Sequence, residues 1–354
     1  MPTTNPAEEI ASEASSLQSR IGSLEQSTRL ANVRDAIEDM QTDINGFAQQ
    51  ITDLRTRSYV FGKDLEASAV NFGSQWTQLA PNVTMQIEQQ SARLQSALVP
   101  LRSRTSQLAA VSSNIPQAQS LLGQLKPQVD SLESQVSAAE NQIRGMYDSF
   151  QDKVSEFRDQ LKKIDWMLAQ LAEASFQLLA TEAGILAVKA VWVKGGKEQK
   201  DDPDGVLYLT DQRLIFEEKE EVAKEKVLFI ATKKEKVQKL LLEAPVATVK
   251  SVTTSKQGML KNEDHIEVRF GSGAPVQFAH FHIWQPCGEW QALINRAKSK
   301  DFDNDRAIAV DAAAAAKVKS APSQCPNCGG NISQVILRGQ DSIKCEFCGF
   351  VIRL

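Results

Sequence analysis

Hydrophobic residues in the first half of the chain recur at alternating spacings of three and four. One such run consists of Leu30, Val33, Ile37, Met40, Ile44, Phe47, Ile51 and Leu54. A longer run consists of Leu122, Leu125, Val129, Leu132, Val136, Ala139, Ile143, Met146, Phe150, Val154, Phe157, Leu161, Ile164, Leu168 and Leu171. The residues between them are mainly Gln, Ser, Glu, Asp and Arg. Sustained seven-residue repeats of this kind predict coiled-coil or long-bundle helices.

The longer run is irregular once, where Met146, Phe150 and Val154 follow at two successive spacings of four. A four-residue insertion of this kind unwinds a supercoil locally, and we expect the helix to continue through it.

A less regular hydrophobic stripe covers residues 72–111 and contains Pro81 and Pro100. Each proline removes a backbone donor, so kinks or breaks are expected there. Asn114 and Pro116 then have the residue types of a helix cap and first turn.

Residues 1–181 therefore form a predicted coiled-coil helical region with segments at about 6–70, 72–112 and 116–181. The pattern leaves open whether these helices fold back on one another or pair between chains as a homo-oligomer. Their polar face is acidic and rich in Gln and Ser, whereas a membrane-surface helix carries Lys and Arg there. A spacer or oligomerisation role is favoured over membrane binding by the helices.

From residue 182 to residue 300 the pattern changes to short β-type runs separated by turns. Candidate strands are 185–193, 206–210, 213–216, 227–230, 240–242, 246–252, 265–270 and 276–283. An amphipathic helix follows at 289–298, with Trp290, Leu293 and Ile294 expected to face the sheet. About seven short strands and a closing helix predict a small split barrel plugged at one end.

The segment Gly205-Val-Leu-Tyr-Leu-Thr-Asp-Gln-Arg-Leu-Ile-Phe216, the spacing to 246–252 and the closing helix resemble a GRAM domain of the pleckstrin-homology (PH) superfold. The resemblance covers residues 182–300. It implies a non-catalytic PH-like β-barrel that binds membrane lipids or protein segments.

Candidate residues for binding an anionic ligand lie between the first two strands. They are Lys194, Lys197 and Lys200. Asp201, Asp202 and Asp204 follow at once and offset much of the attraction to a negatively charged headgroup. A solvated loop is the alternative interpretation. A second basic cluster, Lys233, Lys234, Lys236 and Lys239, is interleaved with acidic residues and has the same two interpretations.

Three smaller features of this region have ordinary structural explanations beside functional ones. Residues 258–261 (Gly-Met-Leu-Lys) form either an apolar tip that enters a bilayer or partner, or a simple turn. His280 and His282 alternate on one strand face, and we interpret them as strand residues without a metal. Cys287 is interpreted as a small buried side chain.

The strongest motif lies at the C-terminal end, where two Cys-x-x-Cys pairs are separated by sixteen residues. The candidate metal ligands are Cys325, Cys328, Cys345 and Cys348. This spacing is typical of zinc sites, because four thiolates complete a tetrahedral shell. The segment resembles a zinc ribbon, with a hairpin expected between 333–338 and 342–344. Four protein ligands imply structural Zn²⁺, and rubredoxin-type iron is the alternative with the same ligands.

The predicted fold class is thus α + β multidomain: coiled-coil helices (1–181), a PH-like β-barrel closed by a helix (182–300), a flexible Ala-rich tether (301–323) and a zinc-ribbon hairpin (324–354). The tether is predicted from the alanines at 312–316 and the scarcity of bulky hydrophobic residues around them.

Composition and charge exclude some classes of function. The net charge is −4, and no segment has the basic excess of a protein that neutralises a phosphate backbone. The N-terminus has no basic and apolar leader, no stretch approaches about 20 apolar residues, and the cysteines suit metal binding in a reducing compartment. These features predict a cytoplasmic protein, peripheral at a membrane at most.

No nucleophile elbow or phosphate-binding glycine loop is visible, so we expect no enzyme. The favoured function is a scaffold or adaptor that docks on a membrane surface or protein partner through its β-domain and ribbon. The alternative is a nucleic-acid-binding regulator directed by the ribbon and dimerised by the helices.

Overall fold

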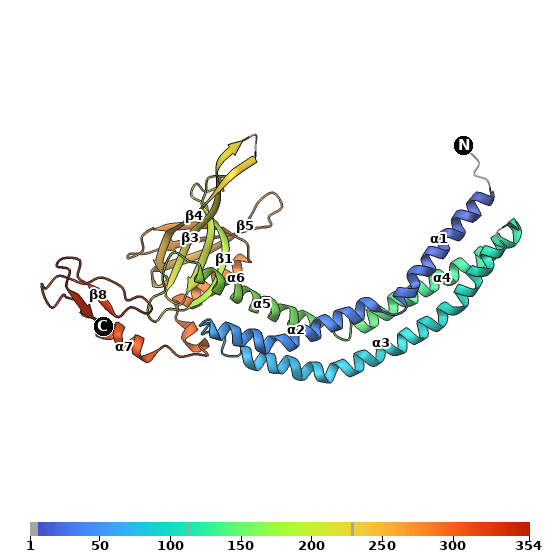
Figure 1. The fold of residues 1–354 in the computed structure, drawn as a ribbon, viewed down its shortest axis with the longest axis horizontal. Helices are drawn as coiled ribbons and strands as arrows, with labels where there is room; N and C mark the ends of the chain where they lie inside the picture. The colour runs from blue at the N-terminus through green and yellow to red at the C-terminus, as the bar shows by residue number, and fades with distance from the viewer. Residues whose placement is uncertain (1–5, 112, 228–229) are drawn as a thin grey trace. The chain divides into compact units, whose positions relative to one another are not determined.

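The computed structural model describes residues 6–111, 113–227 and 230–354, in which long helices precede an antiparallel sheet (Figure 1). Two compact units are present and are described separately. The first comprises residues 1–48 and 67–158, and the second comprises residues 49–66 and 159–354.

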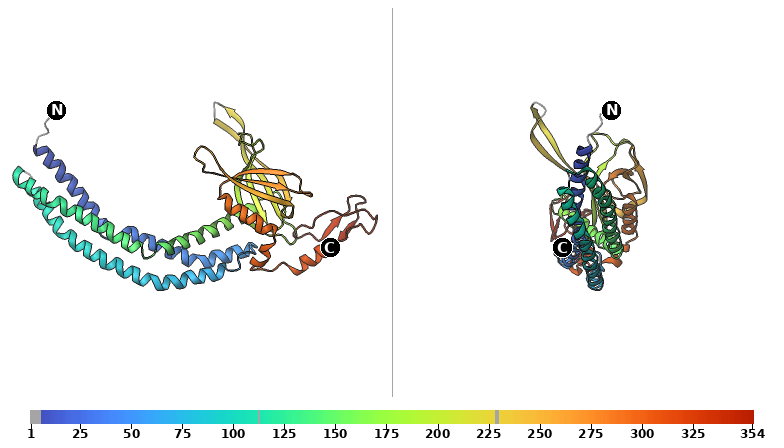
Figure 2. Two further views of the ribbon diagram at one scale, coloured as in Figure 1. Left: turned by 180° about the vertical axis from the view of Figure 1, so that it is seen from behind. Right: turned by 90° about the vertical axis from the view of Figure 1, so that its right-hand side faces the viewer.

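The first unit is a helical bundle. Its helices are α1 (Pro6–Ser27), α2 (Ala31–Thr56), α3 (Leu65–Ala110), α4 (Ile115–Arg144) and α5 (Asp148–Ala172), of which α2, α3 and α5 also extend into the second unit. The chain passes along the bundle three times, as α1 with α2, back as α3, and again as α4 with α5 (Figure 2). The helices therefore pack on one another within a single chain.

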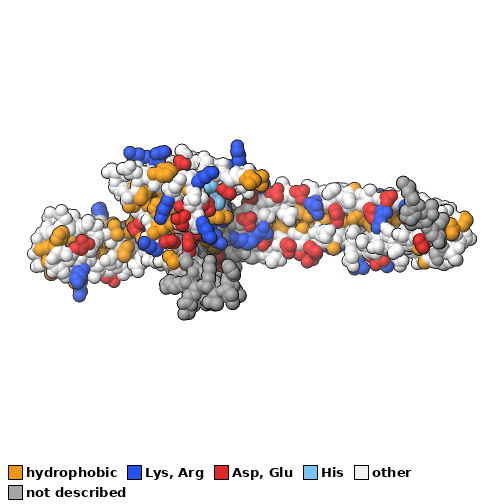
Figure 3. Space-filling view, turned by 90° about the horizontal axis from the view of Figure 1, so that it is seen from above, with side chains coloured by type: hydrophobic (Ala, Val, Ile, Leu, Met, Phe, Trp, Pro, Cys, Tyr) orange, Lys and Arg blue, Asp and Glu red, His pale blue; other side chains and the backbone are white. Residues whose placement is uncertain are grey.

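Ion pairs fix the direction of the first and third passes. Arg20 of α1 binds Glu133 of α4 at 2.6 Å, and Lys126 of α4 binds Glu13 of α1 at 2.8 Å. Both pairs have the same sequence offset, so α1 and α4 run parallel. The hydroxyl of Ser91 in α3 donates to the carbonyl of Thr28. Acidic and basic side chains are interspersed along the helices (Figure 3), as expected of a solvated outer face.

Aromatic rings fill the interior where α2, α3 and α5 meet. Phe47 and Phe157 pack edge to face with centroids 4.9 Å apart, and Phe72 lies 5.2 Å from Phe157. Trp76 stacks on Phe150 at 6.0 Å. The hydrophobic residues of the predicted heptad runs are thus the core of an intramolecular bundle.

The helix does not continue through the irregular spacing at Met146, and the prediction that it would is wrong. Helix α4 ends at Arg144, and α5 begins at Asp148. Tyr147, at 1% exposure, occupies the interior in place of Met146. Two successive steps of four rotate the hydrophobic face away from the core, and the short turn restores it. A similar turn separates α1 from α2, where Leu30 has a φ of 55°.

The prolines have less effect than expected. Helix α3 continues through Pro81 and Pro100, and α4 through Pro127. The side chain of Asn114 accepts a bond from the Gln117 N–H, which confirms the predicted cap.

The second unit contains a seven-stranded antiparallel sheet. Its strands are β1 (Gly184–Trp192), β2 (Asp204–Thr210), β3 (Arg213–Val227), β4 (Ile230–Pro245), β5 (Val249–Gln257), β6 (Glu263–Phe270) and β7 (Phe278–Ile283). Their order is β4-β3-β2-β1-β7-β6-β5, with β4 and β5 at the edges. The predicted barrel is therefore wrong in one respect, because the sheet does not close.

Two short strands predicted at 227–230 and 240–242 belong to one long hairpin. Strands β3 and β4 pair from Arg213 and Pro245 to Val227 and Ile230, well beyond the end of β2 (Figure 1). Residues 228 and 229 lie outside the described residues. Residues 217–226 are mainly Glu and Lys, so a hydrophobicity pattern does not reveal this hairpin.

Helix α6 (Cys287–Lys298) covers one end of the sheet beside β5 and β6. Trp290 and Ile294 are fully buried, as predicted, and Leu293 is partly buried.

A cluster of charged side chains lies buried near the start of β3. The Arg213 guanidinium pairs with the fully buried Glu182 carboxylate and with Glu243 at 2.6 Å. The Thr210 hydroxyl also donates to Glu182. Every buried charge in this group has an opposite charge beside it, as burial of ionised groups requires.

The segment after α6 contacts other parts of the second unit. It contains the short helix η2 (Asp301–Asp305) and α7 (Ala312–Ser320). The N–H groups of Ala307 and Ile308 donate to the Val60 carbonyl, and Arg306 pairs with Asp211. These contacts hold residues 306–308, in the first part of the predicted tether, against the α2–α3 loop and the β2–β3 turn.

Among the described helices, none has an apolar stretch of the length needed to cross a membrane.

Candidate functional site

Two tight turns present the four C-terminal cysteines. In the first, the N–H of Gly329 donates to the carbonyl of Cys325, and in the second the N–H of Gly349 donates to the carbonyl of Cys345. Gly329 and Gly349 have φ values of 71° and 75°, which glycine adopts without steric cost. The two glycines after the Cys-x-x-Cys pairs are thus needed for the turns.

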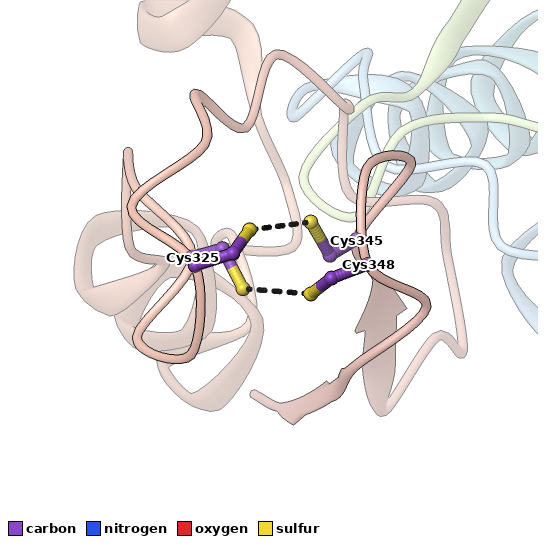
Figure 4. Close-up of side chains that lie close together, drawn as sticks. Cys325, Cys345 and Cys348 are labelled. Atoms are coloured by element: carbon purple, nitrogen blue, oxygen red, sulfur yellow. Dashed lines mark hydrogen bonds between the residues drawn. The ribbon is translucent and has the colours of Figure 1, made fainter.

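The sulfur atoms face one another across the space between the turns (Figure 4). The Sγ atoms of Cys325 and Cys348 are 3.7 Å apart, as are those of Cys328 and Cys345, and all four lie within 4.8 Å of one another. A tetrahedron with metal–sulfur bonds of about 2.3 Å has edges of about 3.8 Å. A disulfide would need about 2.05 Å. The four cysteines therefore could hold one metal ion.

The surroundings of the thiols favour thiolate at one position. The backbone N–H of Phe350 and the side-chain amide of Asn327 lower the pKa of Cys348 to about 6. The pKa of Cys328 is raised to about 12 because the neighbouring thiols outweigh the N–H of Gly330. A bound cation would favour the thiolate of every ligand. The donor set thus fits a soft divalent metal with no open coordination position.

The rest of the C-terminal segment (324–354), which was predicted to be a ribbon, differs in part from its prediction. Strand β8 (Ser342–Lys344) pairs with β9 (Val351–Arg353) and not with 333–338. Residue Ile336 instead accepts a bond from the N–H of Ala180, and the N–H of Arg338 donates to Leu178. The predicted hairpin is therefore wrong in its partner, because the segment before β1 offers unpaired backbone groups to this stretch.

Lys194, Lys197 and Lys200 lie in the β1–β2 loop and are all exposed. The carboxylate of Asp202 is turned inward, where it accepts bonds from the backbone N–H groups of Lys194 and Gln199 at 3.1 and 2.8 Å. Part of the negative charge that follows these lysines in sequence is thus used to shape the loop.

The three histidines of the chain form one cluster on β6 and β7. Nδ1 of His265 lies 3.0 Å from Nε2 of His280, and the ring of His282 stacks on His265 at 4.7 Å and contacts Glu198 at 2.6 Å. Sequence spacing gave only His280 and His282. His265 was missed because strand register, which brings it opposite His282, is not visible in the sequence.

The cluster predicts an acid-sensitive β-domain. Burial lowers the pKa of His265 and His280 below 6.5, with His282, Glu198, Asp202, Glu263 and Glu267 as the facing charged groups. Below pH 6.5 the unfolded chain binds more protons than the folded one, so the free energy of unfolding decreases as the pH falls through the lowered native values.

Thermal unfolding followed between pH 7.5 and 5.0 measures this effect. His280→Gln is expected to flatten the profile, and His282→Gln serves as the control. Equal slopes for the wild type and His280→Gln would contradict the expectation.

Other candidate residues have structural roles or have side chains outside the described residues. Cys287 is buried, its backbone N–H donates to Asp264 at 2.8 Å, and burial raises the pKa of its thiol. The side chains of Lys233, Lys234 and Lys236 lie outside the described residues. Among the described residues, the four C-terminal cysteines are the one group of three or more His, Cys, Asp or Glu side chains close enough to share a metal.

Comparison with known proteins gives no family for this chain. No protein-family model matches it, and no curated protein matches it. Among solved structures, the N-terminally truncated linker-DH/PH domains of p115-RhoGEF match with 11% identity over 83% of this chain and 98% of that chain, at a TM-score of 0.22. A second structure of the DH/PH domains of p115-RhoGEF matches with 13% identity over 82% of this chain and 91% of that chain, also at 0.22. Likeness at this TM-score carries no argument about fold or activity.

Proposed function

We propose that this protein is a non-enzymatic scaffold that docks on a membrane surface or a protein partner through its PH-like β-domain and its ribbon. The helical region (1–181) sets the length over which the scaffold extends, and the β-domain (182–300) binds the membrane surface or the protein partner. The segment 301–323 connects the β-domain to the ribbon (324–354), which holds structural Zn²⁺. Its place is the cytoplasm, at the periphery of a membrane when bound.

The four-cysteine set is the observation that carries this proposal. Four thiolates complete a zinc shell, so no position remains for water or substrate, and the metal has no route to catalysis. Two aromatic residues neighbour Cys348 in the chain and remain in solvent, with Phe347 at 73% and Phe350 at 44% exposure. Exposed aromatic residues on a rigid small module are typical of recognition surfaces.

The β-domain supplies the second binding surface. Asp202 is buried and Glu198 is engaged with His282, which leaves Lys194, Lys197 and Lys200 opposed mainly by Asp201 and by the exposed Asp204 at the start of β2. Three exposed lysines near one another attract an anionic surface by roughly 1 kcal/mol each at most. This loop is the proposed site for a negatively charged headgroup.

The test is co-sedimentation of the full chain with phosphatidylcholine vesicles, with and without phosphatidylserine, at two salt concentrations. Lys194→Ala/Lys197→Ala/Lys200→Ala is expected to weaken binding to the anionic vesicles at low salt by roughly 10-fold or more, because removing the charges removes the attraction. Lys162→Ala/Lys317→Ala/Lys319→Ala is a control that removes the same charge elsewhere.

Absence of binding to every vesicle at low salt would remove the membrane from this proposal and leave a scaffold for protein partners. Steep salt-dependent binding to DNA or RNA would instead favour the nucleic-acid alternative. That alternative has little support, because the Arg338 guanidinium is already engaged with the Glu182 carbonyl and Lys317 pairs with Asp341.

A further inference from the structure

The turn between β5 and β6 exposes two large hydrophobic side chains. The N–H of Lys261 donates to the carbonyl of Gly258 at 3.2 Å, which closes a β-turn with Met259 and Leu260 at its two central positions. Met259 is 100% exposed and Leu260 is 81% exposed. Contacts with the described residues therefore do not account for their hydrophobicity.

Turn chemistry does not account for them either. The central positions of tight turns favour Gly, Asn, Asp, Ser and Pro, which adopt the required backbone angles or bond to the backbone. The turn already has glycine at position 258, where φ is 83°. Two consecutive bulky hydrophobic residues contribute nothing to the backbone angles of such a turn.

A third exposed hydrophobic residue lies at the same end of the sheet. Ile283 pairs with Asp264, so Trp284, the next residue of the chain, lies level with the start of β6, beside the turn. Its indole is 54% exposed and stacks on His282 at 4.3 Å. Tryptophan is enriched at the boundary between lipid headgroups and acyl chains, where one part of the ring is wet and the other is not.

Three lysines lie near these hydrophobic residues, and the carboxylate of Glu263 lies beside Gly258 of the same turn. Lys256 and Lys261 flank the turn, and the backbone carbonyl of Lys189 accepts a bond from the N–H of Trp284. All three lysines are exposed, although Lys256 also pairs with Asp264 at 2.6 Å. Projecting hydrophobic side chains with lysines behind them match an anionic bilayer, whose interior accepts the former and whose headgroups attract the latter.

We infer that Met259, Leu260 and Trp284 form an insertion tip that enters the interface of an anionic lipid bilayer. The shape favours lipid over a folded partner, because a convex turn enters a fluid bilayer directly, whereas a protein would need a matching groove. This inference rests on the proposed membrane docking and names a different surface from the β1–β2 loop.

The experiment uses the full chain and vesicles of phosphatidylcholine with phosphatidylserine. Met259→Ser/Leu260→Ser is expected to weaken binding by about 100-fold or more, because burial of each hydrophobic side chain contributes at least about tenfold. Both side chains lie in solvent, so the fold should be unaffected. Met85→Ser/Val99→Ser removes two exposed hydrophobic residues of α3 as the matched control.

A depth measurement separates insertion from surface attraction. With Met259→Trp, fluorescence should be quenched by lipids brominated on the acyl chain, and the quenching should persist at a salt concentration that abolishes the effect of the β1–β2 lysines. Trp284→Phe should lose part of the quenching seen in the wild type.

The outcomes distinguish this inference from the proposed docking. If the triple lysine variant loses binding while Met259→Ser/Leu260→Ser binds like the wild type, the insertion tip is wrong and the docking proposal stands. Binding without acyl-chain quenching of Met259→Trp also overturns the inference. If the wild type binds no vesicle, the inference and the membrane part of the proposed function both fail.

Discussion

Replacing Cys345 by Ser is expected to unfold the ribbon while the sheet and the helices remain folded. Cys325, Cys345 and Ile352 are the buried residues of the ribbon cluster, with Ile332 packed against it. A core of this size does not offset the conformational entropy of about 30 residues. Metal binding of about 10–16 kcal/mol would have to supply the difference. Chelation of the wild-type protein should have the same result.

Metal analysis together with amide hydrogen exchange tests this expectation. One zinc per chain should fall to none in Cys345→Ser, and the amides of residues 324–354 should lose protection. Cys287→Ser, outside the ligand set, should retain the metal. The same analysis separates zinc from iron, since a tetrathiolate ferric site is coloured and a zinc site is not. A Cys345→Ser protein with an unchanged exchange pattern would show that the ribbon folds without metal.

Replacing Arg213 by Met is expected to destabilise the β-domain by about 3–5 kcal/mol, because it leaves the buried Glu182 carboxylate without its cation. Glu182 has no exposed side-chain surface, and Arg213 has 6%. Denaturant unfolding monitored by fluorescence of the domain gives the change. Arg296→Met is the control, since the pair of Arg296 with Asp301 is nearly half exposed and such pairs contribute about 0–1 kcal/mol.

A second substitution checks the cause of this loss. Adding Glu182→Gln to Arg213→Met removes the stranded charge, so part of the stability should return. If the double variant is no more stable than Arg213→Met alone, lost packing and not an unpaired carboxylate explains the effect.

Much of the architecture could be predicted because it depends on local pattern. The heptad runs predicted the helices, since burial of one face requires that spacing whichever partner covers it. The two Cys-x-x-Cys pairs predicted the sulfur cluster, since each pair and its glycine form one turn. Asn114 predicted a helix start for the same local reason.

The features that the sequence did not predict depend on contacts between segments that are distant in the chain. The pairing of 336–338 with 178–180 depends on the position of the ribbon beside the β-domain, which no spacing reports. The long β3–β4 hairpin is rich in Glu and Lys, so hydrophobic periodicity could not indicate that its two strands pair. His265 joins His280 only through strand register. Whether Lys194, Lys197 and Lys200 bind a ligand remains a prediction.

The two interruptions of the helical bundle lie at nearly the same level. Arg20 pairs with Glu133 and Glu13 with Lys126, so the register between α1 and α4 places Leu30 beside Ile143. The turns at 28–30 and 145–147 are thus about one helical turn apart. Helix α3 continues past both, with Ser91 bonded to Thr28. Because only α3 is continuous at this level, we expect the bundle to bend there more readily than elsewhere along its length.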